Sequence, residues 1–296
     1  MAFDDIETPY GKVEKVIGGA CTYISWAASY FTQDIQVVSI VGGDFPEEEI
    51  KLLESRGVDL SGLEIVADKK SFFWAGKYHD NMNQRDTLVT ELNVLAEFDP
   101  KLGAHHQKAD YVMLGNLTPE IQLSVIQQMT DRPKLIAIDT MNFWMDVAWD
   151  ALHETLKHVD LLVINDEEAR QLSGKYSLIH AAEEIYKKGP KYLIVKKGEH
   201  GAFLFFEDQI FYAPALPLPI VKDPTGAGDT FAGGLMGYIA SKNEVSFESL
   251  KTGIIYGSAM ASFCVEEFSL TRLKNLSQFE IENRVQQFKE MVSFDI

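Results

Sequence analysis

The chain has little of what several classes of protein require. It contains two cysteines, Cys21 and Cys264, with neither a CxxC spacing nor histidines at zinc-ligand intervals beside them, which excludes a disulfide-dense scaffold or a zinc ribbon. No apolar run reaches the roughly 20 residues that a membrane-spanning helix needs. The first residues hold no basic stretch followed by an apolar one, which is the pattern of a secretory signal. We therefore expect a cytoplasmic protein that does not bind membranes.

Positive charge is also scarce, because 27 Lys and Arg stand against 44 Asp and Glu and give a net charge of −17. A surface this acidic repels phosphate backbones, so we expect no nucleic-acid partner. It also repels nucleotides at long range. A phosphate site in this chain must therefore gain local positive potential from helix N-termini, metal ions and a few lysines.

The 296 residues, 46% of them apolar, suffice for a large core without disulfides. Short apolar runs at 36–41, 110–114, 135–138, 161–164 and 192–195 alternate with helical patterns. The runs show little alternation of polar and apolar residues, which is typical of strands buried on both faces of a parallel sheet. Strands that alternate with helices indicate an α/β fold with helices covering the sheet. We expect a single domain over 1–296.

Two stretches, 9–17 and about 71–94, interrupt this rhythm. Both are polar and aromatic with alternating patterns, as in Phe73-Trp74-Ala75-Gly76-Lys77-Tyr78. Such a pattern is typical of exposed strands. The sequence predicts that they form a small sheet outside the main one.

The segment most suggestive of chemistry is 223–230, which reads Asp-Pro-Thr-Gly-Ala-Gly-Asp-Thr and precedes a helical pattern. Gly226 and Gly228 permit a tight turn, and the N–H groups of the following helical turn form an anion site. Asp229 at this helix start would be ionised and able to accept a proton, which suits phosphoryl transfer. The same residues are also compatible with a glycine-rich helix start capped by Asp. Phe231 stands where the third glycine of a GxGxxG motif would lie, and no Walker A lysine follows.

Residues 223–234 resemble the C-terminal signature of the PfkB/ribokinase family of carbohydrate and nucleoside kinases. Further segments resemble other motifs of that family in the same order, over about residues 4–270; these are Gly18-Gly19, 38–44, 57–59, Asn165-x-x-Glu168 and 195–198. The resemblance implies a ribokinase-like three-layer α/β/α fold with a mostly parallel sheet. It also implies that 9–17 and 71–94 form a β-sheet lid, which covers the substrate and forms a homodimer contact.

The resemblance assigns roles residue by residue. Asp229 matches the general base, and the amides of Gly226, Ala227 and Gly228 match the anion hole for the transferred phosphoryl group. The residues implied for the acceptor are Asp4, Gly18, Gly19, Tyr23 and Asn93. The residues implied for ATP are Asn165, Lys197, Gly198, Gly201, Thr225 and Ser258. Glu168 matches a residue that holds Mg²⁺ through water, and Asp223 matches a position associated with a monovalent cation such as K⁺. Taken alone, Asn165 and Glu168 also fit a helix capping box.

The chain departs from the family pattern at three places. Only Met1-Ala2-Phe3 precede Asp4, so we expect a deficient first strand and a poorly positioned Asp4. Tyr23 stands where sugar kinases of the family commonly carry Asn, and it offers one hydroxyl and a large apolar face instead of an amide. No glycine occurs in 266–269, so we expect the loop over the nucleotide to differ.

The leading hypothesis is an ATP-dependent kinase that phosphorylates an alcohol of a sugar or sugar-like molecule. A nucleoside or inositol kinase of the same fold remains an alternative, as does a non-catalytic nucleotide-binding relative. A purely structural or interacting protein would leave the glycine and carboxylate pattern of 226–229 unexplained. Trp74 and Tyr78 fit either contacts with the acceptor or packing within the predicted lid.

Overall fold

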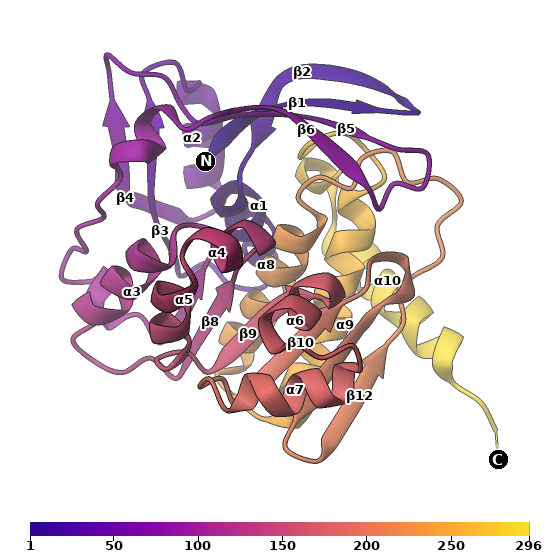
Figure 1. Ribbon diagram of the computed structural model, residues 1–296. Helices are drawn as coiled ribbons and strands as arrows, with labels where there is room; N and C mark the ends of the chain where they lie inside the picture. Colours follow the sequence, from indigo (N-terminus) through magenta and orange to yellow (C-terminus); the bar gives the residue numbers. More distant parts are fainter. Residues whose placement is uncertain (296) are drawn as a thin grey trace. The chain divides into compact units, whose positions relative to one another are not determined.

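The computed structural model describes residues 1–295, and the chain divides into two compact units (Figure 1). The first unit comprises Met1–Phe98, Leu216–Ser241 and Gly253–Ile296, and the second comprises Asp99–Ala215 and Lys242–Thr252. Each unit is built from segments that are distant in the sequence. Within residues 1–295, no helix combines the length and the apolar character that crossing a membrane would require.

The first unit contains a four-stranded sheet in the order β2-β1-β5-β6. Its strands are β1 (Ala2–Thr8), β2 (Gly11–Gly18), β5 (Phe73–Tyr78) and β6 (Arg85–Glu91). Strand β1 pairs antiparallel with β2 and parallel with β5. The two stretches that the sequence sets apart thus lie together in a sheet of their own, as predicted, and β1 joins them.

The expectation of a deficient first strand is wrong. Asp4 lies in the middle of β1, where it pairs with Val16 on one side and Trp74 on the other. Its neighbours Phe3 and Ile6 are 3% and 0% exposed. Pairing on both edges and burial of side chains on both faces of β1 fix the backbone of Asp4.

The remaining strands of the first unit, β3 (Ile35–Gly42) and β4 (Val58–Val66), form a two-stranded parallel sheet. The run 36–41, which we expected in the main sheet, lies in this pair. Helix α2 (Glu47–Ser55) connects the two strands. The core of the unit is built around Trp26, Tyr23 and Phe263. Its other helices are α1 (Ala20–Ala28), α8 (Ala227–Lys242), α10 (Gln278–Val292) and the part of α9 (Phe247–Cys264) from Gly253 onward, with the short turns η1 (Asn93–Glu97) and η4 (Leu273–Asn275).

The second unit contains a six-stranded sheet in the order β12-β11-β10-β9-β8-β7. Its strands are β7 (Tyr111–Leu114), β8 (Leu135–Asp139), β9 (Leu161–Asn165), β10 (Tyr192–Lys196), β11 (Ala202–Phe206) and β12 (Gln209–Ala213). The first four strands are parallel, and β11 and β12 complete the sheet antiparallel. Residues 161–164 are at most 1% exposed, which explains their lack of alternation.

Helices connect the strands of this sheet and pack against one another, with α3 against α5 and α6 against α7. The connections are α3 (Pro119–Gln128), α4 (Asn142–Val147), α5 (Trp149–Leu156), α6 (Asp166–Ser173), α7 (Leu178–Tyr186) and η3 (Gly198–His200), and η2 (His106–Lys108) precedes β7. Because β8, β9 and β10 are parallel, their last residues Asp139, Asn165 and Lys196 lie at one edge of the sheet. In open α/β sheets this carboxyl edge is where ligands bind.

Candidate active site

The glycine-containing turn leads directly into helix α8, as predicted. The turn consists of Asp223–Gly228, which we call the anion turn, and α8 begins at Ala227. Gly226 has a φ of +75°, a conformation that favours glycine. The Thr230 N–H donates to the Gly226 carbonyl at 2.8 Å, and the Ala227 N–H donates to the Pro224 carbonyl at 3.2 Å. Asp229 lies in the first turn of the helix, where the helix dipole stabilises its anionic form.

The carboxylate of Asp223 holds the anion turn in place. Asp223 is 1% exposed, and its two oxygens accept hydrogen bonds from the Thr225 N–H at 2.9 Å and the Ser269 N–H at 3.1 Å. Burial raises the pKa of Asp223, and hydrogen bonds from Thr225 and Ser269 partly offset this rise. The structure therefore gives Asp223 a clear role in shaping the turn.

The ring of Tyr23 packs against the same turn. A Cβ atom added to Gly226 would lie 2.4 Å from ring atoms of Tyr23, so the ring occupies the space that any side chain at 226 would need. Tyr23 is 1% exposed, and its hydroxyl has no hydrogen-bond partner in the part of the chain that the structure describes. Burial raises the pKa of Tyr23 well above its usual value, so the phenol is neutral. Tyr23, a buried residue of α1, thus packs against the turn.

Asp4 presents a buried carboxyl group beside two glycines. A Cβ atom on Gly18 would lie 1.8 Å from Asp4 Oδ2, and one on Gly19, whose φ is +85°, would lie 2.9 Å from the Ala2 nitrogen. Burial, together with the smaller effect of the carboxylates of Asp223 and Asp229, raises the pKa of Asp4 to about 7, while the amino-terminal group acts in the opposite direction. The acid therefore titrates near neutrality, unlike an ordinary aspartate.

One face of strand β5 places further side chains beside Asp4. Trp74 is the register partner of Asp4, and partners on adjacent strands present their side chains on the same face. The indole of Trp74 lies over Gly76, where an added Cβ would be 2.1 Å from it. Tyr78 shares this face, and its hydroxyl accepts a hydrogen bond from Thr225 Oγ1 at 3.1 Å. The face thus combines a carboxyl group, an indole and a phenol.

Asn93, the last residue implied for the acceptor, has a structural role. It begins η1 with a φ of +48°. Its side-chain amide donates to the Ser71 carbonyl at 2.9 Å and contacts a Glu91 oxygen at 3.4 Å. This pairing fixes the chain where β6 ends.

In the second unit, Asn165 and Glu168 form the capping box that the sequence allowed. Asn165 is the N-cap of α6, and its Oδ1 accepts from the Glu168 N–H at 2.8 Å. Glu168 Oε2 in turn accepts from the Asn165 N–H at 2.7 Å. Glu168 is 7% exposed. The pair therefore fixes the start of α6 at the carboxyl edge of the sheet, whatever else it binds.

The other residues implied for ATP lie in two places. After β10, the Lys197 N–H donates to the Gly201 carbonyl at 2.7 Å and closes a tight turn. Gly198 has a φ of +54°, and Gly201 has a φ of +82° and would place a Cβ 2.1 Å from the Ala213 carbonyl oxygen. Both glycines are thus required by the backbone. Ser258 is half-buried in α9 and belongs to the first unit.

The structure adds a charged pair at the carboxyl edge of the sheet that was not predicted from the sequence. Lys196 Nζ lies 3.9 Å from Asp139 Oδ1. These residues end β10 and β8, which flank β9, so the lysine side chain passes the end of β9, where Asn165 lies. Burial raises the pKa of Asp139, and Lys196 partly offsets this rise. The available signal was their shared position as the last residue of parallel strands.

This edge fits a magnesium nucleotide by its chemistry. Phosphate oxygens are bound by ammonium groups, and Mg²⁺ prefers carboxylate oxygens and keeps several waters. Lys196 supplies the ammonium, whereas Glu168 supplies a carboxylate with Asn165 beside it. The donor set matches ATP with Mg²⁺ bound through water.

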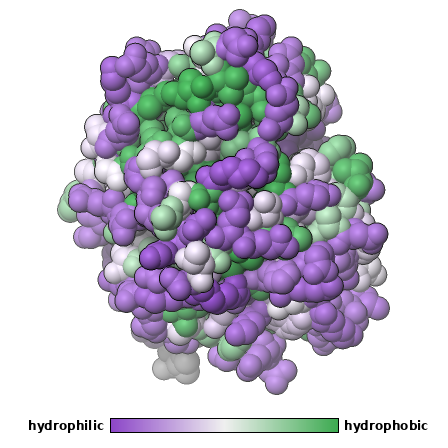
Figure 2. Space-filling view, turned by 90° about the vertical axis from the view of Figure 1, so that its left-hand side faces the viewer, coloured by the Kyte–Doolittle hydropathy of each residue, from purple (hydrophilic) through white to green (hydrophobic). Residues whose placement is uncertain are grey.

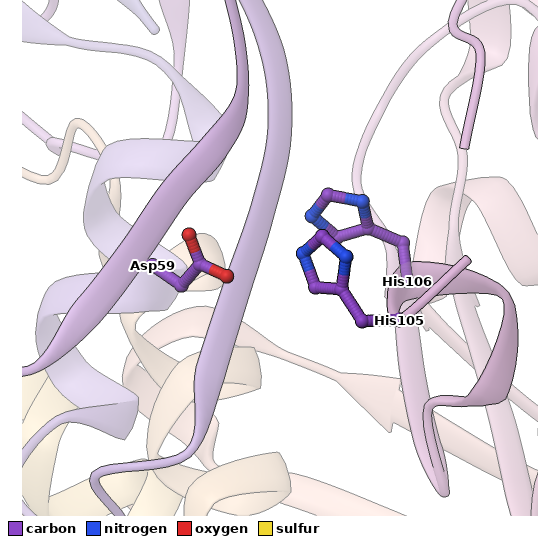
Figure 3. Close-up of side chains that lie close together, drawn as sticks. All are labelled: Asp59, His105 and His106. Atoms are coloured by element: carbon purple, nitrogen blue, oxygen red, sulfur yellow. The ribbon is translucent and has the colours of Figure 1, made fainter. Parts of the chain in front are cut away.

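Figure 3 shows three further side chains with metal-binding chemistry. The rings of His105 and His106, in the second unit, have centroids 3.8 Å apart. Asp59 belongs to β4 of the first unit and accepts a hydrogen bond from the Ser61 N–H at 2.8 Å. Asp59, which belongs to the segment 57–59 that resembles a family motif, therefore has a local structural role through this bond.

The fold and the glycine-carboxylate turn define the class of a ribokinase-like α/β kinase. Comparison with known proteins agrees, because residues 4–275 match the family described as pfkB family carbohydrate kinase. The chain belongs to this family. It is a phosphotransferase that acts on an alcohol group of a carbohydrate or nucleoside.

The relatives and structural neighbours include nucleoside kinases. The chain is 25% identical over 244 residues to a cytidine kinase of Thermococcus kodakarensis, covering 80% of this chain and 86% of the relative. It is 27% identical over 266 residues to a nucleoside kinase of Methanothermobacter thermautotrophicus, covering 88% and 82%. A Burkholderia thailandensis nucleoside kinase in complex with inosine has a TM-score of 0.76 at 19% identity, covering 97% and 95%. A putative ribokinase II from E. coli in complex with ATP and Mg²⁺ has a TM-score of 0.74 at 19% identity, covering 96% of both chains.

Proposed function

We propose that the chain transfers the γ-phosphoryl group of ATP to a hydroxyl of a nucleoside, with Asp229 as general base. The observation that carries this proposal is the anion turn, which places Asp229 in the first turn of α8 within the unit that also buries Asp4. Asp229 accepts the proton of the attacking hydroxyl. The amides of Gly226, Ala227 and Gly228 stabilise the charge on the transferred group, and the Ala227 N–H shares its hydrogen with Pro224.

ATP and Mg²⁺ would be held largely by the second unit. Within the second unit, Lys196, Lys197, Asn165, Gly198 and Gly201 would contact the nucleotide. Thr225 and Ser258, which the resemblance also implies for ATP, belong to the first unit. Glu168 would hold Mg²⁺ through water. The metal, when bound, neutralises charge on the phosphates. Asp223 would act beside a monovalent cation such as K⁺, in addition to its role in the turn.

A nucleoside acceptor is supported by the neighbours of Asp4. The carboxyl group of Asp4 can bind sugar hydroxyls, with Gly18 and Gly19 leaving room beside it. Trp74 adds an aromatic plane on the same face of the sheet, and indole rings pack well against flat apolar groups. The relatives named as cytidine and nucleoside kinases agree with this assignment. A simple sugar or inositol is the alternative acceptor, and a non-catalytic relative would have no use for Asp229.

The sheet β2-β1-β5-β6 would be the lid over the acceptor and a homodimer contact. Strand β6 is at the edge of this sheet, and Leu88 and Val89 on it are 58% and 41% exposed. Exposed apolar residues on an edge strand favour association with another surface. Figure 2 shows an apolar area among polar side chains in the upper part of the view.

The test is a screen for acceptor-dependent ADP formation with Mg-ATP and cytidine, inosine, ribose or myo-inositol, followed by the mass of the product. We expect a nucleoside monophosphate. Asp229→Asn should lower kcat by roughly 10²–10⁴-fold with the fold and ATP binding retained. Asp68→Asn, which alters an exposed carboxylate of the same unit, is the matched control. Near-normal turnover of the Asp229 variant would remove Asp229 from the role of base.

A further inference from the structure

The end of strand β5 contacts the anion turn through two hydroxyl groups. Thr225 Oγ1 donates to the phenol oxygen of Tyr78 at 3.1 Å, across 147 positions of sequence. Tyr78 is the last residue of β5 and is 6% exposed. The bond therefore joins the sheet β2-β1-β5-β6 to the turn that precedes α8, and it is partly buried.

Both partners are fixed by their surroundings. The Thr225 N–H donates to Asp223 Oδ1 at 2.9 Å, and Cys264 Sγ lies 3.6 Å from the Thr225 carbonyl oxygen. On the other side, burial raises the pKa of Tyr78, while Arg85 and the bond from Thr225 partly offset this rise. The phenol is therefore neutral at ordinary pH, and a change in its protonation does not break the contact.

We propose that Tyr78 is a positioning residue for phosphoryl transfer. Through its bond with Thr225, it couples the position of the sheet β2-β1-β5-β6 to the geometry of the anion turn. This inference rests on the proposed function of the turn. Thr225 directly precedes Gly226, so a shift of the hydroxyl pair moves the backbone whose amides bind the transferred group. Small displacements of such groups lower rates strongly. The turn thus reaches its active geometry when the sheet that carries Trp74 is in place.

The test uses Tyr78→Phe, Thr225→Val and the double variant. Tyr30→Phe is the matched control, because the Tyr30 hydroxyl donates to the Leu273 carbonyl at 2.6 Å in the same unit without touching the turn. Each substitution removes a hydroxyl and keeps most of the side-chain volume. A net contribution of roughly 0.5–1.5 kcal/mol for one hydrogen bond corresponds to about two- to tenfold effects.

Amide hydrogen exchange tests the coupling without any acceptor or nucleotide. We expect Tyr78→Phe to accelerate exchange in 225–230 by about two- to tenfold, and Thr225→Val to accelerate it reciprocally in 75–79. The control Tyr30→Phe should leave both segments unchanged and affect the region of Leu273. If neither variant changes exchange in the partner's segment, the inference is wrong.

Kinetics then separates positioning from stability. We expect Tyr78→Phe to lower kcat by about two- to tenfold while KM for ATP stays within twofold, and the double variant to be no slower than the slower single variant. Tyr30→Phe should lower the melting temperature at unchanged kcat. Unchanged kcat in Tyr78→Phe, or single effects that multiply in the double variant, would overturn the inference. A wild type without acceptor-dependent turnover would instead count against the proposed function, and the exchange result would still decide the coupling.

Discussion

Replacing Asp4 by asparagine tests the electrostatics of the candidate site through protein stability. The substitution keeps the shape of the side chain and removes the ionisable group. Asp4 has a pKa of about 7 in the folded chain against 3.8 for an ordinary aspartate. A difference of about three units, at about 1.4 kcal/mol each, gives roughly 4 kcal/mol of free energy linked to this one proton.

The sign follows from proton binding in the two states. Between about pH 4 and pH 7 the folded chain keeps the proton on Asp4, whereas the unfolded chain has lost it. Stability therefore falls as pH rises through this window, by up to roughly 4 kcal/mol. The contribution is fully present below about pH 4 and is lost above about pH 7. Asp4→Asn removes this term, so the variant should gain stability relative to wild type as pH rises, and should be the more stable of the two at pH 8.

The assay is urea denaturation of wild type and Asp4→Asn at pH 5, 6, 7 and 8. Comparing the difference between the two proteins cancels the titrating groups that do not interact with Asp4. Asp223 and Asp229 do interact with it, so their response to the lost charge is part of the measured difference. Asp68→Asn, at an exposed position, should show a difference that does not change with pH. If the stability difference between wild type and Asp4→Asn were the same at pH 5 and pH 8, the burial of a titrating carboxyl group at Asp4 would be refuted.

Two more outcomes follow from the geometry. Gly226→Ala should destabilise the fold by about 1–3 kcal/mol and lower kcat, because the added Cβ would lie 2.4 Å from the Tyr23 ring. Gly174→Ala is the control for backbone strain alone, because Gly174 has a φ of +67° and no atom within 4 Å of an added Cβ. Equal losses of stability for the two variants in urea denaturation would contradict the role of Tyr23. Lys196→Met should weaken ATP binding by roughly ten- to 150-fold, measured by calorimetry without acceptor, since a charged contact contributes roughly 1.5–3 kcal/mol. The exposed Lys191→Met should not weaken it, and equal affinity in both variants would remove Lys196 from the nucleotide site.

The parts of the site that could be predicted from sequence are those built from consecutive residues. The turn from Asp223 to Gly228 and the start of α8 follow from local rules, because glycines set the backbone and the helix start sets the dipole. The strands at 135–138, 161–164 and 192–195 were recognisable because both of their faces are buried. The capping box of Asn165 and Glu168 could also be predicted, since its hydrogen bonds join residues three positions apart.

Contacts between distant segments could not be predicted in this way. Only three residues precede Asp4, which suggested too short a strand, whereas β1 is stabilised by β2 on one edge and β5 on the other. Asp139 and Lys196 meet only because β8 and β10 flank β9. The Tyr78–Thr225 bond likewise depends on tertiary pairing that no local pattern encodes.

The loop at 266–269 illustrates a physical compensation. The sequence lacks a glycine there, and the structure places Ser269 at a φ of +55°. Its N–H donates to Asp223, and its hydroxyl donates to the Ile17 carbonyl at 2.5 Å. Two buried hydrogen bonds can offset the cost of this left-handed conformation, which is of order 1–3 kcal/mol. The local backbone geometry is thus reached with a residue other than the one that local rules favour.

Tyr23 stands where sugar kinases of the family commonly carry Asn. We do not expect this difference by itself to determine which acceptor is bound. Its ring fills the space beside Gly226, and its exposed fraction of 1% leaves little surface for an acceptor. The identities of positions 23 and 226 are therefore coupled, because a larger residue at 226 would require a smaller ring below it. Tyr23 acts on the shape of the anion turn before it can act on the acceptor. Under the proposed function, we therefore expect the acceptor class to depend mainly on the face of the sheet that presents Asp4 and Trp74.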